Sequence, residues 1–262
     1  MQAMIFAAGM GTRLKPLTET MPKAMVTVGG QPLIQRVIAR LKAAGTTRIV
    51  VNVHHFANQI VSSLHDNNNF GVDIRISDET ETLLETGGGI LHARELLQGS
   101  GAFLVHNVDI LSNADLRWLS GQHRDDALAT LLVSPRESSR HFLFRRSDMR
   151  LAGWENVKTG ERLMAIDVPV SDCVALSFSG IHIISDAVFP IMEDYISGLC
   201  PYLSSTALET SSGSAPKFSI RDFYLWAASH HPIYGINDPN LRLLDVGKVG
   251  SLSQASDFLS TC

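Results

Sequence analysis

Residues 6–37 have the sequence FAAGMGTRLKPLTETMPKAMVTVGGQPLIQRV, which is the most informative stretch of the chain. The apolar run Ala3–Ala8 leads into it and predicts a buried strand. Gly9 and Gly11 then interrupt the run. Glycines let the backbone approach an anion closely and direct N–H groups toward it. The stretch therefore predicts a strand followed by an anion-binding turn.

Two or three cationic side chains stand beside this turn. Arg13 and Lys15 follow the glycines directly, and Lys23 comes after Pro22. Such cations suit the charge of a polyphosphate. The order GxxxxGK[ST] of a P-loop is absent, because the lysine here follows a proline. We interpret the stretch as a triphosphate-binding loop of another kind. The alternative is a turn that merely ends a strand, with surface lysines beyond it.

Outward from this loop, strand and helix patterns alternate, which predicts a layered α/β sheet. In the first half we expect strands at 3–8, 48–53, 72–77, 102–107, 127–133 and 142–146, and helices at 32–44, 57–65, 90–97 and 113–122. Shorter strands follow residue 147 and end in a long run at 174–184. We expect a surface loop at 197–216, a helix from Ser219 to 228, strands at 233–236 and 242–246, and a helix at 251–259.

Composition narrows the class of protein. With 262 residues and 45% hydrophobic content, the chain can bury a large core as one domain. A formal charge of −4 argues against a general nucleic-acid binder, which usually has a basic face. The three cysteines show no metal-ligand spacing and fit a reducing compartment. No membrane-spanning run or signal-type N-terminus is visible. We therefore expect a cytoplasmic protein without nucleic-acid or membrane partners.

An acidic residue ends one of the predicted strands. The run Phe103–Asn107 is followed by Val108 and Asp109. In open α/β sheets the carboxyl ends of strands form the ligand-binding edge. Mg²⁺ prefers carboxylate oxygens together with substrate phosphates, so Asp109 is a candidate metal ligand. Taken alone, an aspartate after a strand also serves as a helix cap or a turn residue.

Several segments together resemble the sugar-1-phosphate nucleotidylyltransferase family. They are AAGMGTRLKPLT at 7–18, PKAM at 22–25, GQPLI at 30–34, LETGGGI at 84–90, VHNVD at 105–109, FSGI at 178–181 and LLDVG at 243–247. The resemblance implies a Rossmann-like three-layer α/β nucleotidyltransferase fold. Its central sheet would be mixed and mostly parallel, with a small sugar-binding β subregion. It also implies a single domain over 1–262, with the nucleotide at about 1–133 and the sugar at about 134–262.

The same resemblance implies a reaction and a set of residues. A nucleoside triphosphate and a sugar 1-phosphate would give a nucleotide sugar and diphosphate. Arg13 and Lys23 would be catalytic, and Asp109 and Asp245 would hold Mg²⁺. The remaining implied contacts are to the nucleotide through Ala8, Gly9, Gly11, Thr12, Gly87 and Gly88, and to the sugar through Asn107 and Gly180.

Some of these residues have simpler explanations. Asp245 could be a turn residue before Gly247, and the glycines at 87–89 a flexible helix entry. Gly180 could be a bulge glycine in a strand, and Asn107 could satisfy backbone groups. Outside these motifs, Trp154 with Glu155 could stack on a sugar or pack a turn. Arginines 140, 145, 146 and 150 fit a solvated face better than an anion site, and histidines 54 and 55 fit a strand end better than a metal pair.

The chain departs from the family pattern beside both metal aspartates. Val108 stands where glycine is usual, and Lys248 where threonine is usual. A β-branched residue resists positive φ, so either this backbone is not left-handed or the site geometry is altered. The departures keep open a non-catalytic nucleotide-sugar sensor or regulatory subunit.

The LETGGG segment and the compact length look most like N-acetylmuramate-1-phosphate uridylyltransferases, which favours UTP with an N-acetylmuramate or hexose 1-phosphate. Mannose-1-phosphate guanylyltransferases and glucose-1-phosphate thymidylyltransferases are close competitors. A homodimer is one arrangement to consider, although no residue pattern decides it.

Overall fold

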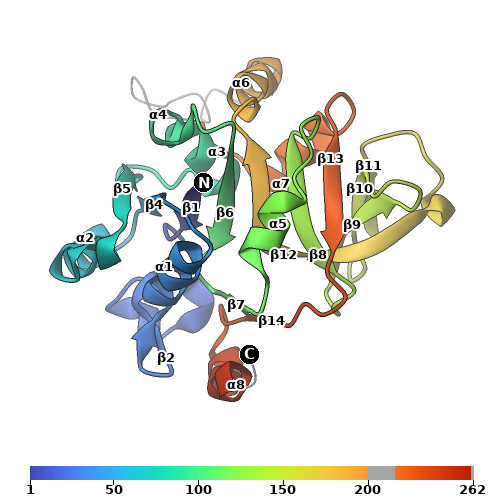
Figure 1. The fold of residues 1–262 in the computed structure, drawn as a ribbon. Helices are drawn as coiled ribbons and strands as arrows, with labels where there is room; N and C mark the ends of the chain where they lie inside the picture. The colour runs from blue at the N-terminus through green and yellow to red at the C-terminus, as the bar shows by residue number, and fades with distance from the viewer. Residues whose placement is uncertain (200–215, 261–262) are drawn as a thin grey trace.

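The computed structural model describes residues 1–199 and 216–260 (Figure 1). Its strands are β1 (Gln2–Phe6), β2 (Thr27–Val28), β3 (Gln31–Pro32), β4 (Arg48–Val53), β5 (Asp73–Asp78), β6 (Ala102–Asn107), β7 (Ile110–Ser112), β8 (Ala129–Ser134), β9 (Arg140–Arg145), β10 (Leu151–Asn156), β11 (Glu161–Met164), β12 (Cys173–Ser185), β13 (Ile233–Asn237) and β14 (Leu243–Asp245). Its helices are α1 (Leu33–Ala43), α2 (Ala57–Asp66), α3 (Glu85–His92), α4 (Arg94–Leu97), α5 (Leu116–Gly121), α6 (Val188–Leu199), α7 (Ile220–Ala227) and α8 (Val249–Ser260).

One mixed sheet dominates the fold. Its strand order is β11-β10-β9-β12-β6-β1-β4-β5, with β8 paired to β12 and β13 paired to β8. Strands β6, β1, β4 and β5 are parallel neighbours, and β12 joins β6 in the antiparallel direction. Parallel strands are buried on both faces, which fits their continuous apolar runs. The predicted mixed sheet with a parallel centre is confirmed.

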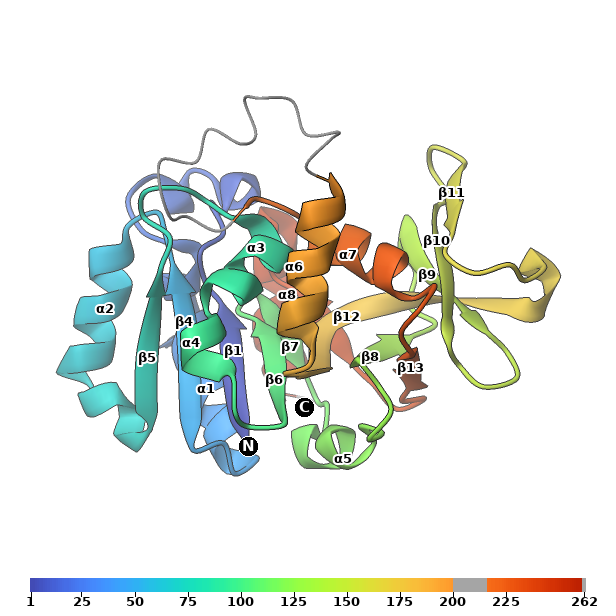
Figure 2. The same ribbon diagram turned by 90° about the horizontal axis from the view of Figure 1, so that it is seen from above.

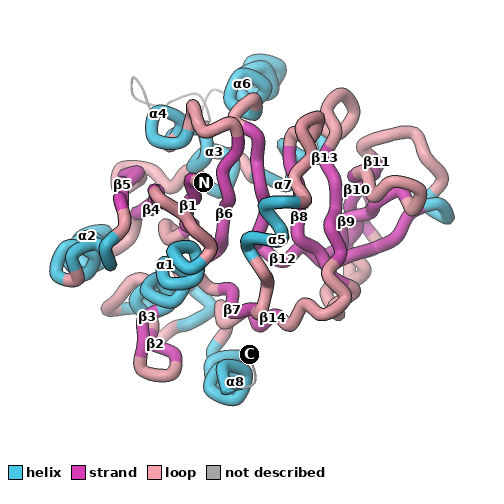
Figure 3. Tube along the Cα trace, viewed as in Figure 1, coloured by secondary structure: helices cyan, strands magenta, loops and turns pink. Residues whose placement is uncertain are grey.

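Helices cover both faces of this sheet, as the cyan segments of Figure 3 show. Successive side chains of a strand point to opposite faces. Accordingly Ala3 and Ile5 of β1 pack in a core with residues of α1, α2 and α5, whereas Met4 packs in a second core with residues of α3, α4, α6 and α7. The result is the predicted three-layer arrangement.

The order of the strands reverses at β1. The chain runs from β1 through α1 to β4 on one side, and later from β5 through α3 and α4 to β6 on the other side. Ligands of open α/β sheets bind at such a reversal, outside the carboxyl ends of the strands. The fold therefore directs attention to the segments that follow β1, β4, β5 and β6.

A smaller antiparallel region extends from the main sheet. Strands β9, β10 and β11 pair in order and join the first half of β12 (Figure 2). The thirteen-residue β12 also pairs with β8 from Ser177 onward and with β6 from Ile181 onward, so it links the two regions. The β subregion inferred from the family resemblance is present at this place.

Two predicted helices differ from the structure. The helix expected at 90–97 is two helices, α3 and α4, and α3 already begins at Glu85, so the glycines lie inside it. The helix expected at 113–122 is shorter and follows strand β7. The predicted loop at 197–216 lies outside the described residues except at its two ends. Among the described helices, none combines the length and apolar character needed to cross a membrane.

Candidate active site

The loop after β1 is folded back on itself at Gly11. This residue is left-handed, with φ of 62°. A methyl group at its Cβ position would lie 2.8 Å from Cγ2 of Thr18 and 3.1 Å from Cβ of Lys23. The Thr18 hydroxyl donates a hydrogen bond of 2.8 Å to the Gly11 carbonyl. Both the backbone angle and the space therefore require glycine at position 11.

Asn52 on the neighbouring β4 holds the start of this loop. Its side-chain oxygen accepts hydrogen bonds from the N–H groups of Ala7 at 2.7 Å and Ala8 at 3.3 Å. Its amide nitrogen donates at 2.7 Å to Oε1 of Glu79, and Oε2 of Glu79 accepts from the N–H of Leu84 at 3.2 Å. One buried polar network thus ties the loop after β1 to the segment after β5.

Sequence analysis missed Asn52 and Glu79. Asn52 is 3% exposed and Glu79 is 2% exposed, and burial raises the pKa of the Glu79 carboxyl. Buried polar groups are nearly always hydrogen-bonded, so a polar residue in an apolar strand indicates a partner. The asparagine in RIVVNV at 48–53 was the available signal.

The two predicted metal ligands lie together although they are far apart in the sequence. Strands β7 and β14 are antiparallel, with Asp245 opposite Ile110, and the Val246 N–H donates to the Asp109 carbonyl at 2.9 Å. A methyl group at Cβ of Gly247 would lie 2.7 Å from Asp109 Oδ2 and 2.8 Å from Asp245 Oδ1. These two oxygens are therefore at most 5.5 Å apart, the sum of the two distances.

Two cations stand at the same place. Nη2 of Arg13 would lie 3.0 Å from that methyl position on Gly247. Nζ of Lys23 forms an ion pair with Oδ2 of Asp109, and each of these two side chains is only 12% exposed. Limited access to water strengthens such charge–charge interactions. The structure thus gathers two acids, an arginine and a lysine around Gly247.

The acid pair fits a hard divalent cation that also binds phosphate. In residues 1–199 and 216–260, no three His, Cys, Asp or Glu side chains gather closely enough to hold a metal ion. Two carboxylates are the typical protein contribution to a Mg²⁺ site whose other ligands are water and substrate phosphates. The donor set Asp109 and Asp245 is consistent with that chemistry.

A cavity of about 400 Å³ opens beside these residues, at the carboxyl ends of the parallel strands. Six of the predicted site residues line it: Ala8, Gly9, Arg13, Lys23, Asn107 and Asp109. The remaining predicted residues do not line it: Gly11, Thr12, Gly87, Gly88, Gly180 and Asp245. Asp245 nevertheless reaches its edge, because its carboxylate lies beside Gly247 and the lining residue Asp109.

The glycines at 87–89 allow close packing of α3. A methyl group would lie 2.4 Å from the Phe218 ring at Gly87, 2.3 Å from the Pro216 carbonyl oxygen at Gly88, and 2.7 Å from Glu79 Oε1 at Gly89. Their neighbours Glu85 and Thr86 line the cavity instead. The role of Gly87 and Gly88 in nucleotide binding stays a prediction.

Gly180 and Asn107 are in contact. Gly180 is left-handed, with φ of 78°, and the register of β12 against β8 shifts between Phe178 and His182. This is the bulge that was the simpler explanation for Gly180. A methyl group on Gly180 would lie 2.7 Å from Nδ2 of Asn107. The bulge therefore gives room to an asparagine side chain that lines the cavity. Sugar binding by the two residues stays a prediction.

The two departures from the family pattern have different surroundings. Val108 does not have positive φ, so this backbone is not left-handed. Its side chain is 3% exposed and packs in the core while lining the cavity. Lys248 is exposed immediately before α8. The first departure is thus accommodated by an ordinary backbone.

Two buried histidines lie behind Asn107 on adjacent strands. Burial lowers the pKa of His106 to about 4. Burial, with a smaller contribution from His106, lowers the pKa of His182 to about 3. Nδ1 of His106 lies 2.8 Å from the Asn107 carbonyl oxygen. Among the described residues, neither Nε2 atom has a hydrogen-bond partner. Both rings are therefore held neutral.

These histidines predict a loss of stability in mild acid. Below pH 6.5 the unfolded chain protonates its histidines, but folded His182 stays neutral down to about pH 3. The unfolded state then binds more protons than the folded state. Each such histidine therefore lowers the free energy of unfolding by about 1.4 kcal/mol for every pH unit by which the pH falls. We expect His182→Leu to reduce this slope by about 1 kcal/mol per unit between pH 6 and 5, measured by urea unfolding. Leucine at the exposed His230 is the control, and an equal change there contradicts the prediction.

Comparisons with known proteins agree with this geometry. Residues 2–143 match the sequence model of a family described as "Nucleotidyl transferase". An N-acetylmuramate alpha-1-phosphate uridylyltransferase from Neisseria meningitidis is 48% identical over 115 residues, which cover 44% of this chain and 49% of that protein. A mannose-1-phosphate guanyltransferase from Candida albicans is 36% identical over 136 residues, covering 51% of this chain and 37% of that protein. The chain thus matches half or less of the length of these relatives.

A solved structure extends the likeness to the whole fold. The inositol-1-phosphate CTP transferase from T. maritima superposes with a TM-score of 0.71 and 17% identity, covering 99% of this chain and 94% of that one. At this level of identity the superposition establishes the fold alone.

Proposed function

This chain belongs to the nucleotidyl transferase family, and from that premise we propose that it is a sugar-1-phosphate nucleotidylyltransferase. It would transfer a nucleotidyl group from a nucleoside triphosphate to a sugar 1-phosphate and release diphosphate. The observation that carries the proposal is the gathering of Asp109, Asp245, Arg13 and Lys23 around Gly247, at the edge of the cavity. In this proposal residues 1–133 hold mainly the nucleotide and residues 134–262 mainly the sugar.

Binding of the triphosphate would use the loop after β1. The backbone at Ala8 and Gly9 lines the cavity, and Asn52 fixes the position of that backbone. Arg13 lines the cavity with an exposed side chain and would neutralise the β- and γ-phosphates. Because Asn52 fixes this backbone before the substrate arrives, little reorganisation of the backbone accompanies binding.

The chemical step is an in-line displacement. An oxygen of the sugar phosphate forms a bond to the α-phosphorus, and the bond from that phosphorus to the bridging oxygen of the β-phosphate breaks. The electron pair leaves with diphosphate, so no protein nucleophile or base is required. Such reactions depend on positioning and on charge stabilisation. Lys23 would lie between the α-phosphate and the sugar phosphate and stabilise the charge on both.

Asp109 and Asp245 would hold a magnesium ion, which supplies charge neutralisation and orientation for the phosphates. In the structure Asp109 is instead paired with Lys23. We infer that Lys23 turns from Asp109 to the phosphates when substrate binds, because the ammonium group then finds a stronger anionic partner.

The proposal for the base and the sugar is supported by the names of the relatives. The uridylyltransferase named above has the higher identity of the two, which favours UTP and N-acetylmuramate 1-phosphate. The guanyltransferase supports GTP with mannose 1-phosphate as the second candidate.

A substrate panel tests the proposal. The protein is mixed with Mg²⁺, one of UTP, GTP, dTTP, CTP or ATP, and one of a set of sugar 1-phosphates, and diphosphate release is measured. We expect turnover with one preferred pair and loss of turnover with EDTA. If no pair reacts but a nucleotide sugar binds tightly, the protein is a sensor or regulatory subunit and the catalytic proposal is wrong.

A further inference from the structure

A second cavity, of about 210 Å³, lies between β9, β10, β12 and the start of α7. Four aromatic rings and two arginines line most of it: Phe142, Trp154, Phe178, Tyr224, Arg140 and Arg221. Most of these residues lie beyond residue 143, outside the part of the chain that matches the family. Arg140 and Phe142 lie inside the matching part.

The second cavity is adjacent to the first. The N–H of Ile220, which lines the second cavity, donates at 3.0 Å to Oγ1 of Thr86, which lines the first. On the opposite side, Phe178 lies two residues before Gly180 on β12. Gly180 abuts Asn107 of the first cavity. A sugar with its phosphate near Lys23 can therefore extend a substituent toward the second cavity.

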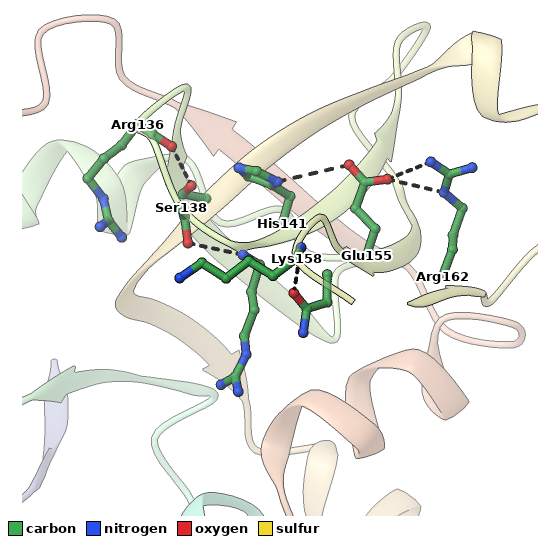
Figure 4. Close-up of polar contacts among 9 residues, drawn as sticks. Arg136, Ser138, His141, Glu155, Lys158 and Arg162 are labelled. Atoms are coloured by element: carbon green, nitrogen blue, oxygen red, sulfur yellow. Dashed lines mark hydrogen bonds and ion pairs between the residues drawn. The ribbon is translucent and has the colours of Figure 1, made fainter. Parts of the chain in front are cut away.

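The neighbouring acids of the second cavity are already paired. Glu155 accepts from Arg162 at 2.8 Å and lies 3.9 Å from Nδ1 of His141, a row of contacts that Figure 4 shows. Asp222 pairs with Arg221 at 2.5 Å. Among the described residues, no carboxylate lies within ion-pair distance of the Arg140 guanidinium. The cavity therefore offers one cation that has no anion to neutralise it.

Aromatic walls complete the cavity. Trp154 is 4% exposed, and the Arg221 guanidinium lies 4.6 Å from the centre of its ring. Phe142 and Phe178 meet edge to face at 6.0 Å between ring centres. Such walls pack against the apolar parts of a ligand, while a few polar groups fix its orientation. A guanidinium group pairs with a carboxylate through two parallel hydrogen bonds.

We propose that this cavity binds an acidic substituent of the sugar 1-phosphate, with Arg140 paired to its carboxylate. The inference rests on the proposed function and adds the cavity and the arginine that would select an acidic sugar over a neutral one. Arg140 is exposed, as expected of a solvated face, and the proposal gives it a binding role in addition; Trp154 gains a binding role as well.

The test compares matched sugars that differ in a carboxylate. N-acetylmuramate 1-phosphate is paired with N-acetylglucosamine 1-phosphate, and glucuronate 1-phosphate with glucose 1-phosphate. The readout is the ratio of kcat/KM for the acidic sugar to that for the neutral sugar. We expect the unmodified protein to prefer one acidic sugar, and Arg140→Gln to lower the ratio about 10- to 100-fold, mainly through KM. Arg140→Lys should restore part of it.

Arg145→Gln is the matched control. Arg145 lies on the same strand but pairs with Asp148 at 2.5 Å and does not line the cavity. The ratio should stay as in the unmodified protein. The inference is overturned if the neutral sugars are preferred, or if Arg140→Gln leaves the ratio unchanged.

Direct binding separates this inference from the proposed function. The four sugar phosphates are titrated into each protein by calorimetry. If no nucleotide is consumed, the proposed function fails. The inference still stands in that case if the acidic sugar phosphates bind and Arg140→Gln selectively weakens their binding. If the acidic sugar phosphates do not bind, the inference fails together with the proposed function.

Discussion

Lys23→Ala is expected to slow nucleotidyl transfer by about 100- to 1000-fold, the range found when one preorganised electrostatic group is removed from an active site. The lysine is 12% exposed, lines the cavity and is paired with Asp109, so its charge acts where water is largely excluded. Charge on the α-phosphate and the leaving diphosphate increases toward the transition state, and the ammonium group stabilises it there. The effect should therefore appear mainly in kcat.

The same loop supplies a matched control for Lys23. Lys15 is also a lysine beside the glycine turn, but its side chain is 59% exposed and pairs at 3.9 Å with Glu19. It does not line the cavity. Lys15→Ala should keep diphosphate release within a few-fold of the unmodified rate, since exposed ion pairs contribute little. Equal rates in the two variants would falsify the assigned role of Lys23, provided circular dichroism shows both are folded.

Gly247→Ala is expected to lower activity by about 100-fold with little change in stability. Its backbone is not left-handed, so alanine is sterically allowed on that ground. The new methyl group would lie 2.7 Å from Asp109 Oδ2, 2.8 Å from Asp245 Oδ1 and 3.0 Å from Arg13 Nη2. These are the ends of side chains, so they would move apart and the fold would remain. Moving these side-chain ends would misplace the charges of the active site but would leave the hydrophobic core packed as before.

Steady-state diphosphate release measures the activity of Gly247→Ala, and urea unfolding measures its stability. Gly250→Ala is the control, because a methyl group there meets no atom within 4 Å and the residue lies in α8. It should be as active as the unmodified protein and slightly more stable, since alanine favours helix over glycine. The prediction is wrong if Gly247→Ala retains full activity, or if it loses activity only because the chain unfolds.

Much of the fold could be predicted because local patterns and tertiary packing agree. The apolar runs at 48–53 and 102–107 are strands β4 and β6 with the expected bounds. Helix α7 begins after Ser219, where the helix was expected, and the Ser219 hydroxyl caps it by accepting from the Arg221 N–H at 3.2 Å. Helix α3 was placed too late, since glycine disfavours helix in isolation. Packing against Pro216 and Phe218 overrides that preference.

The site was predictable where a motif carries it and not where a single residue does. The aspartates, Arg13 and Lys23 were found through segments of several residues that resemble a family. Asn52 and Glu79 belong to no such segment, and their importance appears only when β4 and β5 bring them together. Val108 was an ambiguous signal, because residue type alone does not determine its backbone angle. In the structure, the Val108 N–H donates to the Phe6 carbonyl at 3.3 Å, so tertiary pairing of the two segments sets that angle.

The pairing of β7 with β14 has a consequence for biosynthesis. Asp245 leaves the ribosome 136 residues after Asp109. At translation speeds of roughly 5–20 residues per second, this delay lasts roughly 7–27 seconds. Throughout it, the nascent chain carries its phosphate-binding loop and its first acid without the second. Under the proposed function, newly made protein cannot consume nucleotide until β14 has paired with β7 and brought Asp245 to Asp109.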